Sequence, residues 1–227
     1  MAFRIKAAAR GLAALVFVAA PAFTQPFTFA VRHGTLTFTA AGVRYDDSRA
    51  KKDRSWSRDY GNIQQLSLSP TEIRLRTYDD VRWQLGRDRE YVFQHLAPGE
   101  TAKLYPFLSA RLDRRFVARL PEPVSAPEWE VPAKMLRRTS GYNGVLKIGA
   151  DRIVFEAAGE HASRTWRYTD LASVSSSGLY QLSFTSLDGE TRFQLKEALS
   201  EDRYNDLWRR VMDVNGLQAF QSSGSHH

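Results

Sequence analysis

The chain has 227 residues, of which 43% are hydrophobic and 12% are aromatic. This composition excludes a disordered chain, and the length allows one large domain or two small ones. No cysteine is present, which excludes disulfide bonds, thiolate nucleophiles and sulfur ligands for a metal. The formal net charge is +7, but basic residues often lie beside acidic ones, as in RDRE at 87–90. A nucleic-acid partner, which needs a clustered positive face, is therefore not expected.

The N-terminal segment has the order of a secretory signal. Basic residues at positions 4, 6 and 10 precede an uncharged apolar run that ends in the small-residue step Ala20-Pro21-Ala22. We expect a signal peptide over residues 1–22 and export to the periplasm or the extracellular space. The alternative is an uncleaved membrane anchor, since no charge appears between Arg10 and Arg32. Prolines interrupt this run, however, and leave it shorter than the ~20 residues of a membrane span.

The sequence matches itself at an offset of 110 residues. GTLTFTAAGVRY at 34–45 aligns without gaps on GVLKIGADRIVF at 144–155, and the apolar positions coincide. At the same offset, Arg-Ser-Trp at 54–56 corresponds to Arg-Thr-Trp at 164–166. This agreement predicts an internal duplication in which Trp56 and Trp166 occupy equivalent positions.

Each copy alternates apolar and polar residues with the period of two that a half-buried hairpin requires. Further alternating segments at 63–66 and 72–78, and at 171–174 and 179–186, predict more strands. Each copy then changes to helical spacing. The second helix has one apolar stripe, formed by Tyr204, Leu207, Trp208, Val211 and Met212. The first helix contains Pro106, so it must begin late or bend there.

These patterns predict two units, at 27–120 and 134–216. Between them, residues 121–133 hold four of the nine prolines, which predicts a semi-rigid linker. The polar end at 217–227 is expected to be a flexible tail.

The motifs Gly144-x-Leu146-x-Ile148, Trp166-Arg167-Tyr168-x-Asp170-Leu171 and Phe193-Gln194-Leu195, with the closing helix, resemble bacterial PH/GRAM-like (pleckstrin-homology-like) domains. The resemblance implies a mainly β (α+β) fold of two antiparallel half-barrels, each closed by a C-terminal amphipathic helix. Phosphoinositide-binding members tend to carry basic residues in the loop between their first two strands. The hairpin loops expected here, at 40–42 and 149–151, have no lysine or arginine, so that activity is not carried over.

Candidate contacts for an anion or a partner are the basic residues Lys51, Lys52, Lys134, Arg137 and Arg138. A structural role is expected for the aromatic residues Trp56, Trp166, Tyr204 and Trp208. The histidines at 33, 95 and 161 have no second histidine at metal-binding spacing, so neither a metal nor another cofactor is expected. The serine cluster at 173–177 lacks the glycines of a nucleophile elbow, and no catalytic residue is predicted.

These observations favour a non-enzymatic exported protein, a cell-envelope scaffold that binds another protein or an envelope ligand. One alternative is a membrane-associated protein, held by an uncleaved N-terminal anchor or by peripheral contacts with anionic lipid. A second alternative is a hydrolase with a site between the two units.

Overall fold

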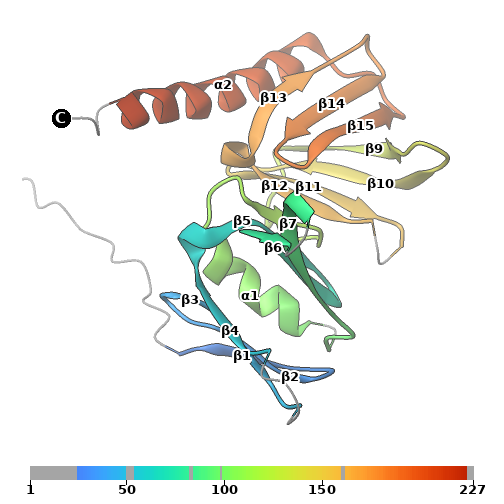
Figure 1. The fold of residues 1–227 in the computed structure, drawn as a ribbon. Helices are drawn as coiled ribbons and strands as arrows, with labels where there is room; N and C mark the ends of the chain where they lie inside the picture. Colours follow the sequence, from blue (N-terminus) through green and yellow to red (C-terminus); the bar gives the residue numbers. More distant parts are fainter. Residues whose placement is uncertain (1–24, 50–53, 82–83, 98, 160–161, 224–227) are drawn as a thin grey trace, which may run out of the picture.

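The computed structural model describes residues 25–49, 54–81, 84–97, 99–159 and 162–223 (Figure 1). The expected signal peptide at 1–22 lies outside these residues. The fold is mainly β, with two sheets of four and eleven strands in the described part of the chain. This agrees with the period-two alternation in the sequence.

The first half of the chain contains a four-stranded antiparallel sheet, three longer strands and a helix. The sheet has the order β1-β2-β3-β4, and the other strands continue antiparallel from a short 3₁₀ turn. The elements are β1 (Phe27–Val31), β2 (Gly34–Phe38), β3 (Gly42–Asp47), β4 (Trp56–Asp59), β5 (Ile63–Ser69), β6 (Glu72–Val81), β7 (Gln84–Gln94), α1 (Glu100–Ser109) and β8 (Phe116–Ala118).

The second half repeats this order. Seven strands with a 3₁₀ turn between the fourth and fifth are followed by a helix, and here the last strand pairs with the first. The elements are β9 (Trp129–Leu136), β10 (Gly141–Ile148), β11 (Arg152–Ala157), β12 (Arg164–Arg167), β13 (Leu171–Ser175), β14 (Gln181–Ser186), β15 (Gly189–Leu195) and α2 (Glu201–Ser223).

The hairpin expected from the alternating segments forms the second and third strands of each half. Strands β1 and β9 precede it, and the sequence pattern predicted neither. β9 was hidden in the expected linker at 121–133, because that segment includes Pro132. Val131 and Ala133 are nevertheless buried in the core, and Pro132 still uses its carbonyl to accept a hydrogen bond from Lys196 N at 2.8 Å. The linker prediction is therefore wrong from Trp129 onward.

The two tryptophans are not equivalent in strand register. Trp56 pairs with Tyr45, whereas Trp166 pairs with Ile153, the counterpart of Val43. The counterpart of Trp166 in the first half is Arg58, which pairs with Val43. The offset of 110 residues holds in the second and third strands of each half and becomes 108 at the fourth.

The tryptophans also differ in burial. Trp166 is fully buried, and Trp56 is only partly buried. Both still contact the matching phenylalanine of the last strand, since Trp56 lies 6.3 Å from Phe93 and Trp166 lies 6.1 Å from Phe193, between ring centroids. Their environments are related, but Trp56 lies two residues before the position on its strand that is equivalent to Trp166.

Buried hydrophobic side chains form two separate clusters. One runs from Phe29 to Leu120 and the other from Val131 to Val211. Each half of the chain therefore has a hydrophobic core of its own, which the alternating pattern of each copy provides.

The two helices are used differently. α1 lies between the four-stranded sheet and strands β5 to β7 (Figure 1) and buries Leu104, Phe107 and Leu108. It begins at Glu100 and continues through Pro106, so the first of the two expected alternatives, a late start, is wrong. α2 packs against β13 and the preceding 3₁₀ turn.

α2 is longer than the sequence pattern predicted. It buries Leu207 and Val211, Tyr204 packs against the same core, and Trp208 at the edge of the stripe is 47% exposed. The helix continues to Ser223, which corrects the expected tail at 217–227. Among the described residues, neither helix combines the length and the apolar character that crossing a membrane requires.

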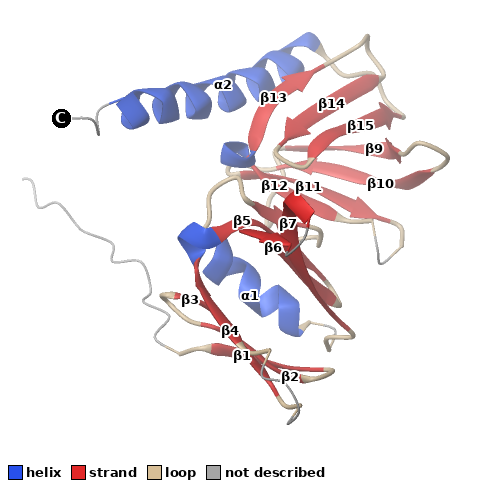
Figure 2. Cartoon of the chain, in the orientation of Figure 1, coloured by secondary structure: helices blue, strands red, loops and turns tan. Residues whose placement is uncertain are grey.

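Strand β8 joins the halves. It pairs in parallel with β5 and antiparallel with β12 through Ala118 and Thr165. One eleven-stranded sheet therefore passes from β7 in the first half to β13 in the second (Figure 2).

Candidate functional site: an arginine-lined pocket

Strand β12 lies at the centre of the molecule, and its alternating side chains serve two purposes. Thr165 and Arg167 point to the first half, where Thr165 Oγ1 donates to Leu120 O at 2.8 Å and Arg167 Nη1 donates to Leu112 O at 2.9 Å. Arg164 and Trp166 belong to the opposite face, since side chains alternate along a strand. Arg164 lies over the Trp166 ring, 4.6 Å from its centroid.

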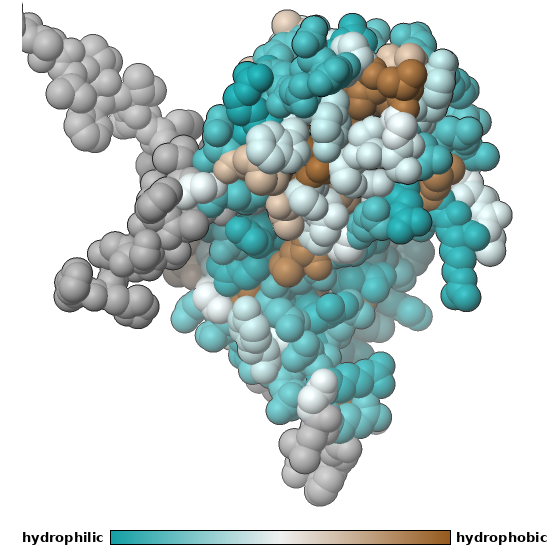
Figure 3. Space-filling model, turned by 90° about the horizontal axis from the view of Figure 1, so that it is seen from above, coloured by the Kyte–Doolittle hydropathy of each residue, from teal (hydrophilic) through white to brown (hydrophobic). Residues whose placement is uncertain are grey.

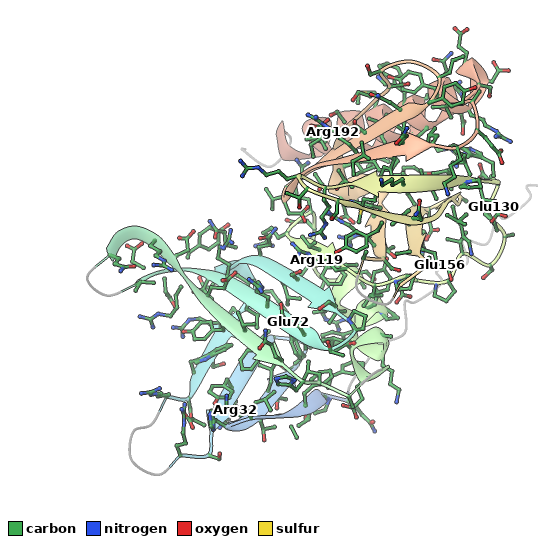
Figure 4. All side chains as sticks on the ribbon, turned by 90° about the vertical axis from the view of Figure 1, so that its right-hand side faces the viewer. Arg32, Glu72, Arg119, Glu130, Glu156 and Arg192 are labelled. Carbon is green, nitrogen blue, oxygen red and sulfur yellow. The ribbon has the colours of Figure 1, made fainter. Side chains whose placement is uncertain are left out.

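Beside Arg164 is an open pocket of about 730 Å³. It is bounded by the ends of β9 and β15, the turn between β14 and β15, and the segment that follows β8. Figure 4 labels Arg119 where the halves meet and Arg192 on the strands of the second half. The charged side chains of the lining are Arg119, Arg137, Arg138, Arg164, Arg192, Asp188 and Glu190. Five guanidinium groups thus face two carboxylates.

Arg164 is the buried member of this group. Its side chain is 14% exposed. Nη1 donates to Thr191 Oγ1 at 3.3 Å, and Nη2 donates to Ser186 Oγ at 3.2 Å and to Asp188 Oδ1. Nε is buried and has no hydrogen-bond partner among the described residues. Burial lowers the pKa of Arg164, and the Asp188 charge opposes this effect.

Asp188 lies at the turn between β14 and β15, and its side chain is 9% exposed. Ser186 Oγ donates to its Oδ1 at 2.7 Å, and Arg119 Nη2 lies 3.6 Å from its Oδ2. Burial alone would raise the pKa of Asp188, but the Arg164 charge and the Ser186 hydrogen bond outweigh burial and leave the pKa below its usual value. Asp188 is therefore an ionised carboxylate at neutral pH.

Arg137 and Arg138 form the outer rim, in the loop between β9 and β10. Both residues are exposed. The Arg137 guanidinium lies 5.3 Å from the Tyr142 ring centroid, and Arg138 makes no hydrogen bond or ion pair with another described residue. At the other side of the rim, Glu190 accepts a hydrogen bond from Arg192 Nη2 at 2.6 Å. The rim arginines are thus accessible to an external anion.

The structure brings together part of the basic set expected from sequence. Arg137 and Arg138 line the pocket, whereas Lys134, three residues earlier on β9, is outside the lining. Lys51 and Lys52 lie outside the described residues. Arg119, Arg164 and Asp188 were missed. Arg164 begins the Arg-Thr-Trp motif, but only the tertiary structure brings it to the turn at Asp188.

The two loops that were compared with the phosphoinositide-binding loop do not connect the first two strands. The loops at 40–42 and 149–151 connect the second and third strands of each half. The loop between the first two strands of the second half is 137–140, which contains Arg137 and Arg138. The absence of basic residues from 149–151 therefore says nothing about this site.

Another, smaller pocket of about 240 Å³ lies beside β1 and β7 in the first half. Its lining includes His33 and His95. Within the described part of the chain, no three histidine, aspartate or glutamate side chains are grouped so that they could hold a metal ion.

No family model matches the chain, and no curated protein matches it either.

Proposed function

We propose that this protein binds the anionic group of a ligand or partner in the arginine-lined pocket, as a non-enzymatic protein of the exported compartment. The observation that carries the proposal is the excess of five guanidinium groups over two carboxylates around one open pocket. Guanidinium groups donate planar, charge-assisted hydrogen bonds that match carboxylate and phosphate oxygens. Export is supported by the N-terminal sequence.

The lining favours binding over acid–base chemistry. Asp188 and Glu190 are both held by arginines, and the pKa of Glu190 is lowered, chiefly by its hydrogen bond from Arg192. A carboxylate whose pKa is lowered in this way is a weak general base. The Ser163 hydroxyl accepts a hydrogen bond from Ala157 N at 3.0 Å, so it has a structural partner. A hydrolase site at the junction of the halves has less support from these contacts.

We also propose that each half is a PH-like unit. The repeated order of seven strands and a helix supports this interpretation. In the second half, the pairing of β15 with β9 further supports a curved, partly wrapped sheet.

The test is a titration of inorganic pyrophosphate into the full chain, in which calorimetry measures the heat of binding. The double variant R137A/R138A should bind at least about tenfold more weakly, because it removes two charge-assisted contacts. The control is R44A/R209A, which removes the same charge from two arginines outside the pocket that are each 65% exposed. Equal loss in both variants would show attraction to net charge alone and would contradict a pocket site.

A second candidate function is contact with an anionic membrane surface. Leu136 and Tyr142 near the arginine rim are 38% and 39% exposed, and Leu187, beside Asp188, is 53% exposed. Apolar side chains beside arginines suit a lipid interface. Seen from above, however, the molecule is mainly hydrophilic, with small and separate apolar patches (Figure 3).

Vesicle flotation distinguishes the two functions. If a membrane is the target, the wild-type chain should float with vesicles that contain anionic lipid, and L136A/L187A should not. If the target is a small anionic group, L136A/L187A should bind pyrophosphate as the wild type does, and flotation should be absent.

A further inference from the structure

Asp188 occupies the place that an anion would take in the pocket. Its carboxylate lies between the buried guanidinium of Arg164 and the more exposed guanidinium of Arg119. Ser186 supplies a third donor. An external carboxylate or phosphate entering the pocket would seek the same arginine donors, so the two anions compete.

The backbone around Asp188 allows the carboxylate to leave. Ser186 and Gly189 are paired across the hairpin, so only Leu187 and Asp188 lie in the turn between them. Gly189 has φ +108°, a conformation that suits glycine, and it sets this turn. A rotation of the Asp188 side chain therefore leaves the hydrogen bonds between β14 and β15 intact.

We propose that Asp188 is an internal competitor for the anion site, which holds Arg164 and Arg119 in the free protein and is displaced when the ligand binds. This inference rests on the proposed function of the pocket and concerns how the site is regulated. A bound anion takes over the pairing of Arg164, so the buried charge is paired in both states. The Asp188 carboxylate passes into water, where it is readily hydrated.

The displacement also sets the class of ligand. Asp188 offers two oxygens, and it leaves Arg164 Nε without a partner. A phosphate group offers at least three acceptor oxygens and more charge than a carboxylate, so it competes better for several guanidinium groups. The structure thus assigns the pocket to a phosphate-bearing ligand rather than to a simple carboxylate.

The experiment compares three variants of the full chain by pyrophosphate titration. D188N removes the competitor and should bind about tenfold more tightly than the wild type. D151N removes an equal charge from an exposed turn outside the pocket. D170N removes a buried carboxylate that pairs with Arg167 outside the pocket. Both controls should stay within about threefold of the wild type.

A further titration with acetate tests the ligand class. Acetate should bind wild type and D188N much more weakly than pyrophosphate does. Acetate binding as tight as pyrophosphate binding would overturn the assignment to a phosphate-bearing ligand.

D188N also leaves the buried Arg164 with fewer partners, which destabilises the fold. A second variant therefore tests the proposal without removing the Asp188 charge. S186A removes the hydroxyl that orients Asp188 and keeps the charge, and it should tighten pyrophosphate binding about threefold. If D188N is less stable, pyrophosphate should raise its unfolding midpoint more than that of the wild type.

The outcomes separate the two proposals. If the wild type binds and depends on Arg137 and Arg138, but D188N and S186A bind no more tightly than D151N, the proposal that Asp188 competes is overturned and the anion-binding pocket is retained. If neither the wild type nor D188N binds pyrophosphate, both proposals are wrong. Binding seen only in D188N supports the competitor directly.

Discussion

Arg167 of the second half donates a hydrogen bond from Nη1 to the backbone oxygen of Leu112 in the first half, at 2.9 Å. The same side chain donates to the carbonyl oxygens of Ser109 and Asp113, near the C-terminal end of α1, and pairs with Asp170. A cation at this place satisfies carbonyls that the helix leaves open. One arginine thus links the two hydrophobic cores.

Replacing Arg167 should therefore uncouple the halves. R167A should lower the free energy of unfolding by about 3 kcal/mol, since it removes the donor to partly buried carbonyls and leaves Asp170 with only the backbone N–H of residue 167. Urea unfolding followed by circular dichroism should change from one transition to two. The control is R192A, which breaks an exposed pair and should change stability by less than about 0.5 kcal/mol. A single, unshifted transition in R167A would contradict this link.

The two tryptophans should differ in their contribution to stability. W166A removes a fully buried ring and should cost about 3 to 5 kcal/mol. W56A removes a partly buried ring, for which we expect about 1 to 2 kcal/mol. Chemical denaturation of both variants measures the difference. Equal costs would favour the equivalence that the sequence motif suggested.

Gly144 should tolerate no side chain. A Cβ atom there would lie 2.2 Å from the carbonyl oxygen of Glu156 on the neighbouring strand. G144A should therefore cost about 2 kcal/mol through forced strand separation. G159A is the matched control, since a Cβ atom at Gly159 meets nothing within 4 Å, and its thermal midpoint should stay near that of the wild type.

Tyr105 should make stability fall at high pH. Burial raises the pKa of Tyr105 to about 12, although the nearby charge of Arg152 acts in the opposite direction. In the unfolded chain, tyrosine ionises near pH ~10. The raised pKa adds stability that is complete below this value and is lost as the pH rises toward 12.

An absorbance titration checks this shift. The wild type should contain one more late-titrating tyrosine than Y105F. The stability of Y105F should also fall less steeply between pH 10 and 12. If the titration curves of the two proteins differ instead near the usual tyrosine value, Tyr105 is not shielded from solvent.

The sequence by itself determined the mainly β character, the repeated order and most strand positions, because alternating side chains report which face of a strand is buried. It could not locate β9, where Pro132 disguises a buried strand. The sequence does show two extra residues between Trp56 and Ile63 relative to Trp166 and Leu171. It could not show that the register changes before the tryptophan, because a shift of two residues keeps the same face buried.

Only the tertiary structure decided the candidate site. Arg137 and Arg138 were visible as a basic pair, but Arg119, Arg164 and Asp188 come from three distant segments. Strand pairing between β8 and β12 brings the first two together, and the hairpin of β14 and β15 adds the third. Local patterns describe which residues are buried along one element, whereas a pocket depends on where different elements meet.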